Sequence, residues 1–204
     1  EFNPVSFDAR AWVDLAQAAG MKYLVFTTRH HDGFSLFETK ASDYKITSPL
    51  SPYRRDIVKE LAAACHAAGL KFGLYYSQPD WHHPDAFTPD RHPRYLAYLK
   101  TQVRELLTHY GKVDILWFDG LGKTAADYDG VAVNQMAREL QPHLLINNRN
   151  GLPEDFDTPE QRVGKYQDTR PWESCITICK QWAWKPADTM KSLEECLRTL
   201  VLCA

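Results

Sequence analysis

The sequence predicts an α/β fold in which parallel strands alternate with helices and close into a (β/α)8-type, TIM-like barrel. Helical and strand patterns alternate along the chain, which implies parallel strands joined by right-handed crossovers. Polar residues follow several different strands, as they do where a barrel builds its site. No glycine-rich phosphate motif follows a strand, which disfavours the alternative, an open doubly wound nucleotide-binding sheet.

The chain has 204 residues, whereas a complete barrel of this type usually has roughly 250. Periodicity indicates only about five or six strands. We therefore expect a single catalytic barrel domain over residues 1–204 that is incomplete, with its first strand and its last one or two strands missing.

The first helix–strand unit begins at Asp8, a suitable N-cap, and Gly20 is placed to end the helix. The strand expected next, 23–28, leads into His30 and His31. An apolar stripe at helical spacing predicts which face of the helix is buried, namely Trp12, Leu15, Ala16 and Ala19.

The second unit repeats the first. A helix follows Asp56, ends at Gly69 and leads into a strand over 71–76. Its predicted apolar stripe comprises Ile57, Leu61, Ala64, Cys65 and Ala68.

Two further units complete the regular pattern. A helix from about residue 95 to Gly111 precedes a strand over 113–119, and a helix that halts at Pro142 precedes a strand over 144–147. A long polar segment, 148–171, is followed by a short strand near 175–178 and a last helix around 192–202.

Composition excludes several classes of partner. Lys and Arg total 24 against 26 Asp and Glu, with no basic block, so nucleic acid and anionic membranes are poor candidates. No apolar stretch approaches the roughly 20 residues of a membrane span. Five cysteines without a Cys-x-x-Cys pair indicate buried or free thiols and leave the compartment undecided.

The strand over 113–119 ends in Trp117, Phe118, Asp119 and Gly120. Asp119 therefore sits where a buried strand leaves the core, the end at which barrels gather catalytic groups. The alternative is an ordinary turn acid.

The sequence His30-His31-Asp32 follows another strand. These residues could ligate a metal, with Asp119 or the His82–His83 pair completing the shell. Two histidines adjacent on a regular strand point to opposite faces, so both could ligate one ion only from a loop. The other interpretations are a structural histidine pair, or imidazoles that donate hydrogen bonds to ligand hydroxyls.

The remaining candidates are aromatic or charged. Tyr75, Trp117, Trp172 and Trp182 could be core residues or the apolar wall of a sugar site. Arg149 could be a structural ion-pair partner, and Glu160 a solvated loop acid. If a loop glutamate meets Asp119 over a pocket rich in histidines and aromatics, the two would form a glycosidase pair.

Four segments together carry a family resemblance that covers essentially the whole chain. They are Thr27 to Phe34, Phe72 to Ser77, Trp117 to Gly120 and Trp172 to Cys175. In their order and spacing they resemble the α-L-fucosidases of glycoside hydrolase family 29.

The resemblance implies a retaining exo-hydrolase that releases terminal α-L-fucose from oligosaccharides or glycoconjugates, without a cofactor or a metal. Asp119 matches the nucleophile of the family. Glu160 is the first candidate for the acid/base by its position after Arg149, and Glu173 is the second. The other positions match substrate-binding residues: the hydroxyl-binding His30 and His31, the pocket residues Tyr75 and Trp117, Arg149 near the acid/base, and Trp182 near the sugar methyl group.

The chain departs from the family pattern where Trp182-Ala183-Trp184 replaces Trp-Gly-Tyr. We expect the family's first barrel strand, with its additional histidine, and the closing strands to lie outside this sequence. Two other functions stay open: a non-catalytic fucose-binding or truncated barrel that keeps the pocket but lacks turnover, and a metal-dependent hydrolase. The resemblance favours a periplasmic, secreted or lysosome-like location over the cytoplasm. It leaves the linkage preference and a homo-oligomer open.

Overall fold

The computed structural model describes residues 2–120, 124–163, 168–183 and 185–203. The chain divides into two compact units, Glu1–Glu154 and Asp155–Ala204. Each unit is described by itself.

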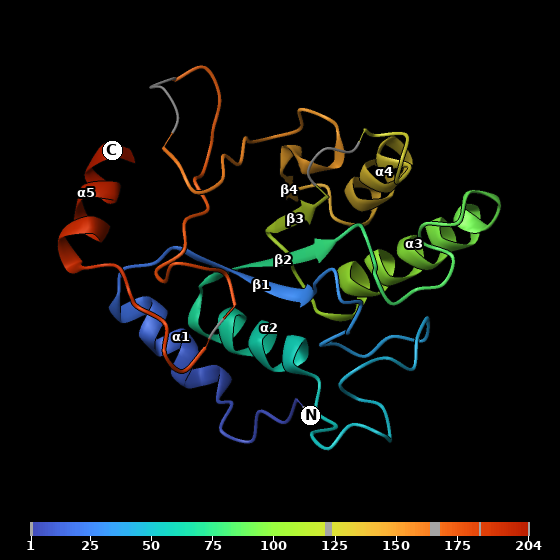
Figure 1. The fold of residues 1–204 in the computed structure, drawn as a ribbon, viewed down its shortest axis with the longest axis horizontal. Helices are drawn as coiled ribbons and strands as arrows, with labels where there is room; N and C mark the ends of the chain where they lie inside the picture. The colour runs from blue at the N-terminus through green and yellow to red at the C-terminus, as the bar shows by residue number, and fades with distance from the viewer. Residues whose placement is uncertain (1, 121–123, 164–167, 184, 204) are drawn as a thin grey trace. The chain divides into compact units, whose positions relative to one another are not determined.

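The N-terminal unit is built on one parallel sheet (Figure 1). Its strands are β1 (Tyr23–Arg29), β2 (Lys71–Ser77), β3 (Ile115–Asp119) and β4 (Leu145–Ile146), hydrogen-bonded in that order. The four predicted strands of the regular units are confirmed, and so is the parallel α/β class. In the described part of the chain the sheet has two edges, β1 and β4, so closure into a barrel stays a prediction.

Four helices connect and cover the strands. They are α1 (Ala9–Ala18), α2 (Ile57–Ala68), α3 (His92–His109) and α4 (Gly130–Leu140), with α1 against α2 and α3 against α4 (Figure 1). The predicted caps are in place. Backbone N–H groups at the start of α1 donate to Asp8, the Lys59 N–H donates to Asp56, and Gly69 ends α2 with φ +69°.

The buried face of α1 differs from the predicted stripe. Trp12 and Leu15 are 48% and 70% exposed, whereas Ala9, Val13 and Ala16 are buried. The two stripes share Ala16 and are both compatible with helical spacing, so periodicity alone selected the wrong one. The small side chains allow α1 to approach its neighbour closely, and the large ones remain at the surface.

Side chains of the central strands alternate between two environments. Tyr76 is fully buried and its hydroxyl donates to Gln102 of α3, while Tyr75 projects to the other face. Leu74 and Leu116 are also fully buried, and they join Val103 and Leu106 of α3 in one hydrophobic core. The core thus fixes β2 and β3, the two strands that carry Tyr75 and Asp119.

The C-terminal unit contains one regular element among its described residues, α5 (Leu193–Cys203), together with isolated bridges. The helix begins with a capping box in which Ser192 and Glu195 each accept a hydrogen bond from the other's backbone N–H. The short strand predicted near 175–178 is wrong. Among the described residues, Cys175 makes a single parallel bridge, to Glu160, and the neighbouring prolines 159 and 171 have no N–H to extend a ladder. None of the described helices could cross a membrane.

Candidate active site

The carboxyl ends of the four strands bring the candidate residues of the N-terminal unit to one edge of the sheet. Asp119 ends β3 and pairs in register with Ser77 at the end of β2. Beyond β4, the Asn147 side chain exchanges two 2.9 Å hydrogen bonds with the backbone of Phe118. The Asn147 side chain thus continues the hydrogen-bond ladder beyond the end of β4. The chain then enters the 3-10 turn η2 (Asn148–Asn150), which carries Arg149.

Asp119 is held from both sides by its neighbours. The Tyr75 hydroxyl donates to Oδ2 at 2.6 Å, and Arg149 Nη1 lies 3.2 Å from Oδ1. The Gly120 N–H also donates to Oδ1 at 3.0 Å. The Arg149 side chain is only 3% exposed and the Asp119 side chain 16%. A nearly buried guanidinium and a phenol thus stabilise the negative charge of Asp119 and fix its orientation.

His30 and His31 lie after the end of β1, in a turn, so their rings can face the same region. The ring centroids are 4.2 Å apart, and His30 stacks on Tyr75 at 5.6 Å. His31 Nε2 lies 3.6 Å from Asp119 Oδ2. The register of β1 against β2 shifts between Thr27 and Arg29, a bulge-type irregularity of the kind that re-aims side chains next to active sites.

Aromatic and cationic groups complete this surface. Trp117 stacks on Tyr75 with ring centroids 5.5 Å apart, and the Arg149 guanidinium lies 4.5 Å from the centre of the Trp117 ring. The structure therefore brings together six of the predicted site residues: His30, His31, Tyr75, Trp117, Asp119 and Arg149.

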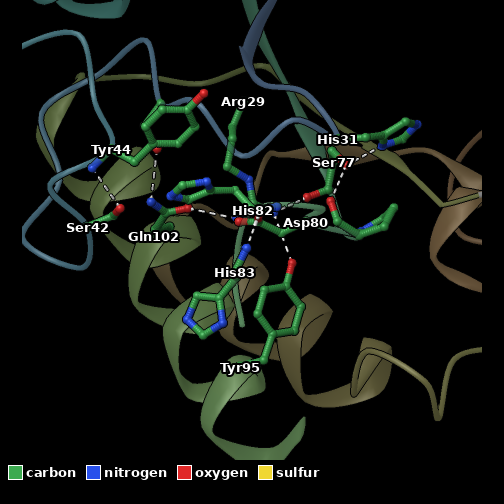
Figure 2. A network of polar contacts seen from close by, with 12 residues as sticks. Arg29, His31, Ser42, Tyr44, Ser77, Asp80, His82, His83, Tyr95 and Gln102 are labelled. Carbon is green, nitrogen blue, oxygen red and sulfur yellow. Dashed lines mark hydrogen bonds and ion pairs between the residues drawn. The ribbon is translucent and has the colours of Figure 1, made fainter. Parts of the chain in front are cut away.

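A buried ion pair supports the histidine turn. Arg29 is fully buried, and its Nη1 donates to Asp80 Oδ2 at 2.9 Å (Figure 2). Asp80 Oδ1 accepts the N–H groups of His82 and His83, each at 2.9 Å, and the Trp81 N–H donates to the His31 carbonyl at 2.7 Å. Arg29 also donates to Tyr95 of α3 at 3.1 Å. The end of β1 and the loop after β2 are thereby tied into one network.

The charge states of this network follow from burial and from the neighbouring side chains. The pKa of His31 is lowered, chiefly by burial and next by His30, although Asp119 acts to raise it. Burial would also lower the pKa of Arg29, but the phenols of Tyr76, Tyr95 and Tyr98 and the Asp80 carboxylate raise it overall. We therefore expect a neutral His31 and a charged Arg29 near pH 7.

His30, His31 and Asp119 also meet the geometric requirement for a cation site, because they offer ligand atoms within 4.8 Å of one another. Both oxygens of Asp119 are already engaged, one by the Arg149 guanidinium and the other by the Tyr75 hydroxyl. A positive charge 3.2 Å from a potential ligand atom disfavours a second cation at the same carboxylate. The arrangement is better suited to neutral hydroxyl groups.

A cavity of about 520 Å³ borders His30. Its walls include the aromatic rings of Phe34 and Tyr44 and the charged groups of Asp43 and Lys45. Mixed apolar and polar walls of this kind are typical of small-ligand sites.

The other candidates, Glu160, Trp172, Glu173 and Trp182, belong to the C-terminal unit. Glu160 and Glu173 lie on two extended segments that pair in parallel, with bridges between Asp157 and Trp172 and between Glu160 and Cys175. The Glu173 N–H donates to the Asp157 carbonyl at 2.9 Å. Trp182 lies in a bend, and Trp184 is outside the described residues.

The family model described as Alpha-L-fucosidase matches residues 1–204. The chain belongs to the alpha-L-fucosidase family.

Individual fucosidases support the assignment. Plasma alpha-L-fucosidase of Homo sapiens is 39% identical over 221 residues, covering 98% of this chain and 47% of the human protein. The solved structure of alpha-L-fucosidase isoenzyme 1 from Paenibacillus thiaminolyticus superposes with a TM-score of 0.92 at 40% identity, covering 100% of this chain and 56% of that one. A complex of the Lactobacillus casei fucosidase AlfC with alpha-L-fucose product matches with a TM-score of 0.81 at 35% identity, covering 98% and 68%.

The chain thus spans about half the length, or less, of the curated fucosidases that it matches. The matches establish the family and the fold of this portion.

Three residues of the site were not singled out from the sequence: Arg29, Ser77 and Asp80. Arg29 and Ser77 lie inside segments that resemble the fucosidase family, at the ends of predicted strands. That position is the sequence feature by which they could have been identified as site residues. Asp80 follows a proline and has the form of a turn residue. Its pairing with an arginine 51 positions earlier is a tertiary contact that no local pattern encodes.

Gly33 ends the histidine turn, and its substitution tests the rigidity of that turn. Gly33 has φ +80°, and an added Cβ would lie 2.3 Å from Asp80 Oδ1. Two backbone N–H groups hold this oxygen in place, and Arg29 holds the other oxygen of the same carboxylate. Gly20 has a similar φ, +74°, with nothing within 4 Å of an added Cβ. We expect Gly20→Ala to lower the free energy of unfolding by about 1 kcal/mol. Gly33→Ala should cost about 1–3 kcal/mol more.

Urea denaturation of the two variants measures this difference. Equal losses would show that the Asp80 carboxylate is free to move, contrary to the tight network described above.

Proposed function

We propose that this protein is a retaining exo-α-L-fucosidase that hydrolyses terminal α-L-fucosides of oligosaccharides or glycoconjugates through a covalent glycosyl-enzyme on Asp119. The observation that carries the proposal is the Asp119 carboxylate at the end of β3, paired with Arg149 and Tyr75 and flanked by His30 and His31. Membership of the fucosidase family supports the substrate class.

The proposed mechanism uses Asp119 as the nucleophile. Its carboxylate attacks the anomeric carbon while a protonated glutamate donates its proton to the departing glycosidic oxygen. Formation of the ester neutralises Asp119, and the same glutamate, now ionised, removes a proton from water as the water attacks the anomeric carbon. The fucose is released with its original configuration because two inversions have occurred.

The other residues of the site bind the sugar. His30 and His31 are placed to hydrogen-bond fucose hydroxyls, while Tyr75 and Trp117 offer aromatic surface and Tyr75 also orients Asp119. We assign the acid/base to Glu160, with Glu173 as the alternative, and Trp182 to the methyl group of the sugar. We further propose that β1 to β4 belong to a (β/α)8-type barrel, and that the protein acts outside the cytoplasm. Relatives named plasma and tissue alpha-L-fucosidase support that location.

The test of this function is hydrolysis of 4-nitrophenyl α-L-fucoside, followed by proton NMR of the first product formed. A retaining enzyme releases α-L-fucose first and the β anomer appears later by mutarotation. Initial release of β-L-fucose would contradict the covalent mechanism, because it would report a single inversion.

A metal-dependent hydrolase is the second candidate, favoured by the grouping of His30, His31 and Asp119. Activity measured with and without a chelator distinguishes the two functions. The fucosidase proposed here keeps its full rate in EDTA, whereas the metal-dependent enzyme loses activity and regains it with added divalent cation.

The acid/base assignment predicts a dependence on the leaving group. For a fucosyl disaccharide, whose leaving group must be protonated, Glu160→Ala should lower kcat/KM by about 10²–10⁴-fold. For a dinitrophenyl fucoside, whose leaving group needs no proton, kcat/KM should change little. Glu173→Ala serves as the matched comparison. If Glu173→Ala shows the selective loss and Glu160→Ala does not, the roles are exchanged.

A further inference from the structure

Ser77 has a geometry that defines the tautomer of His31. Ser77 ends β2 next to Asp119, and its side chain is fully buried. Its Oγ lies 2.5 Å from His31 Nδ1 and 2.7 Å from the carbonyl oxygen of Pro79 (Figure 2 shows the contact with His31). A carbonyl oxygen can only accept, so the single hydroxyl hydrogen of Ser77 is donated to Pro79. The Ser77 oxygen is then left to accept from His31, which requires a proton on Nδ1.

The other ring nitrogen of His31 faces the candidate site. Nε2 lies 3.6 Å from Asp119 Oδ2, beyond the 2.7–3.2 Å range of N–H···O hydrogen bonds. Asp119 Oδ2 is already served by the Tyr75 hydroxyl at 2.6 Å. The lowered pKa of His31 favours a ring with a single proton. With that proton on Nδ1, Nε2 carries a lone pair.

We propose that Ser77 is a positioning residue that, through the Pro79 carbonyl, fixes His31 as the Nδ1–H tautomer, so that Nε2 accepts a hydrogen bond from a substrate hydroxyl beside Asp119. This inference rests on the proposed function for the identity of the ligand, but the tautomer itself does not depend on it. It reverses the expectation from the sequence that the imidazole donates to the sugar. His31 Nε2 is then an acceptor beside Asp119 Oδ2, which already accepts from Tyr75, and a hydroxyl hydrogen is the group that Nε2 lacks.

The arrangement has a consequence for selectivity. A sugar that carries fluorine in place of the hydroxyl facing His31 can accept a hydrogen bond but cannot donate one. The site should therefore reject this analogue as strongly as it rejects the deoxy sugar, since both leave Nε2 unpaired.

The tautomer can be observed directly by long-range proton–nitrogen NMR of the 15N-labelled protein near pH 7.5, with His31→Gln to assign the signals. The expected result is a protonated Nδ1 and an unprotonated Nε2 for His31. Two other histidines give internal references with the opposite tautomer. His66 Nε2 faces the Lys112 carbonyl at 2.7 Å, and His83 Nδ1 accepts the Asp85 N–H at 3.1 Å, so both should carry the proton on Nε2. A proton on Nε2 of His31 would overturn the proposal whether or not the protein hydrolyses fucosides.

Substitution of Ser77 completes the test. In Ser77→Ala the acceptor for Nδ1–H is lost, and we expect the proton to move to Nε2, towards Asp119, with kcat/KM falling about tenfold. Ser77→Thr keeps the hydroxyl and should restore both the Nδ1–H signal and the rate. In a His31→Ala background, Ser77→Ala should have no further effect on kcat/KM, because Ser77 acts through His31. A tenfold loss that persists in that background would show a merely structural role and would contradict the proposal.

Discussion

Replacement of Asp119 by alanine is expected to lower kcat/KM for an aryl α-L-fucoside by at least about 10³-fold, because the variant has no group to form the covalent intermediate. Loss of the carboxylate also removes the contact at 3.2 Å that Asp119 makes with the Arg149 guanidinium, whose side chain is only 3% exposed. The effect should fall mainly on kcat, since His30, His31 and Trp117 still offer their contacts to the sugar.

Asp114→Asn provides the matched control. Asp114 lies just before the same strand at its opposite end, where it pairs with Lys112 at 2.9 Å and Lys71 at 3.6 Å. In the wild type the Phe72 N–H donates to the Asp114 carboxylate at 3.1 Å. The amide oxygen of the variant can still accept this hydrogen bond. We expect an activity close to that of the wild type. A comparable loss in both variants would indicate that the strand, rather than the Asp119 carboxylate, had been perturbed.

Breaking the buried pair between Arg29 and Asp80 should have the largest effect on stability. The two side chains are 0% and 2% exposed, and Asp80→Ala would leave a buried guanidinium without its counter-charge. We expect the free energy of unfolding to fall by about 3–5 kcal/mol. The same change removes the acceptor of the His82 and His83 N–H groups, so the loop that contacts His31 through Trp81 should also loosen.

Urea denaturation measures this loss, and two variants make it specific. Asp80→Asn keeps an oxygen for the two N–H groups and removes only the charge, so its cost isolates the pairing with Arg29. Asp14→Ala breaks an exposed pair with Arg10, 3.9 Å apart and 64% exposed at the aspartate. Such surface pairs contribute about 0–1 kcal/mol. An Asp80→Ala loss no greater than that of Asp14→Ala would refute the structural role of the network.

The sequence predicted the order and type of the regular elements because local rules decide them. Asp8 and Asp56 cap helices as expected, Gly69 ends a helix, and the apolar strand before Asp119 is buried. The same rules failed for the buried face of α1, where two stripes fitted helical spacing. They also failed for the predicted strand near 175–178, where segments rich in polar residues and proline form single bridges.

The candidate site was predictable where a residue follows a strand. His30, His31, Tyr75, Trp117 and Asp119 lie at strand ends, and parallel strands bring those ends to one edge. The supporting contacts were not predictable, because they join residues far apart in the chain: Arg29 with Asp80, Ser77 with His31, and Arg149 with Asp119. These contacts determine charge and tautomer, which residue type alone leaves open.

Azide rescue of Asp119→Ala tests the central claim most directly. A small anion can enter the space left by the carboxylate and attack the anomeric carbon of an aryl α-L-fucoside that has a good leaving group. The account predicts that azide restores turnover and that the product, identified by NMR, is β-L-fucosyl azide, the inverted configuration. Two results would contradict the assignment of Asp119 as the nucleophile. One is turnover of Asp119→Ala at the wild-type rate without azide. The other is an inactive variant whose turnover azide does not restore and that forms no fucosyl azide.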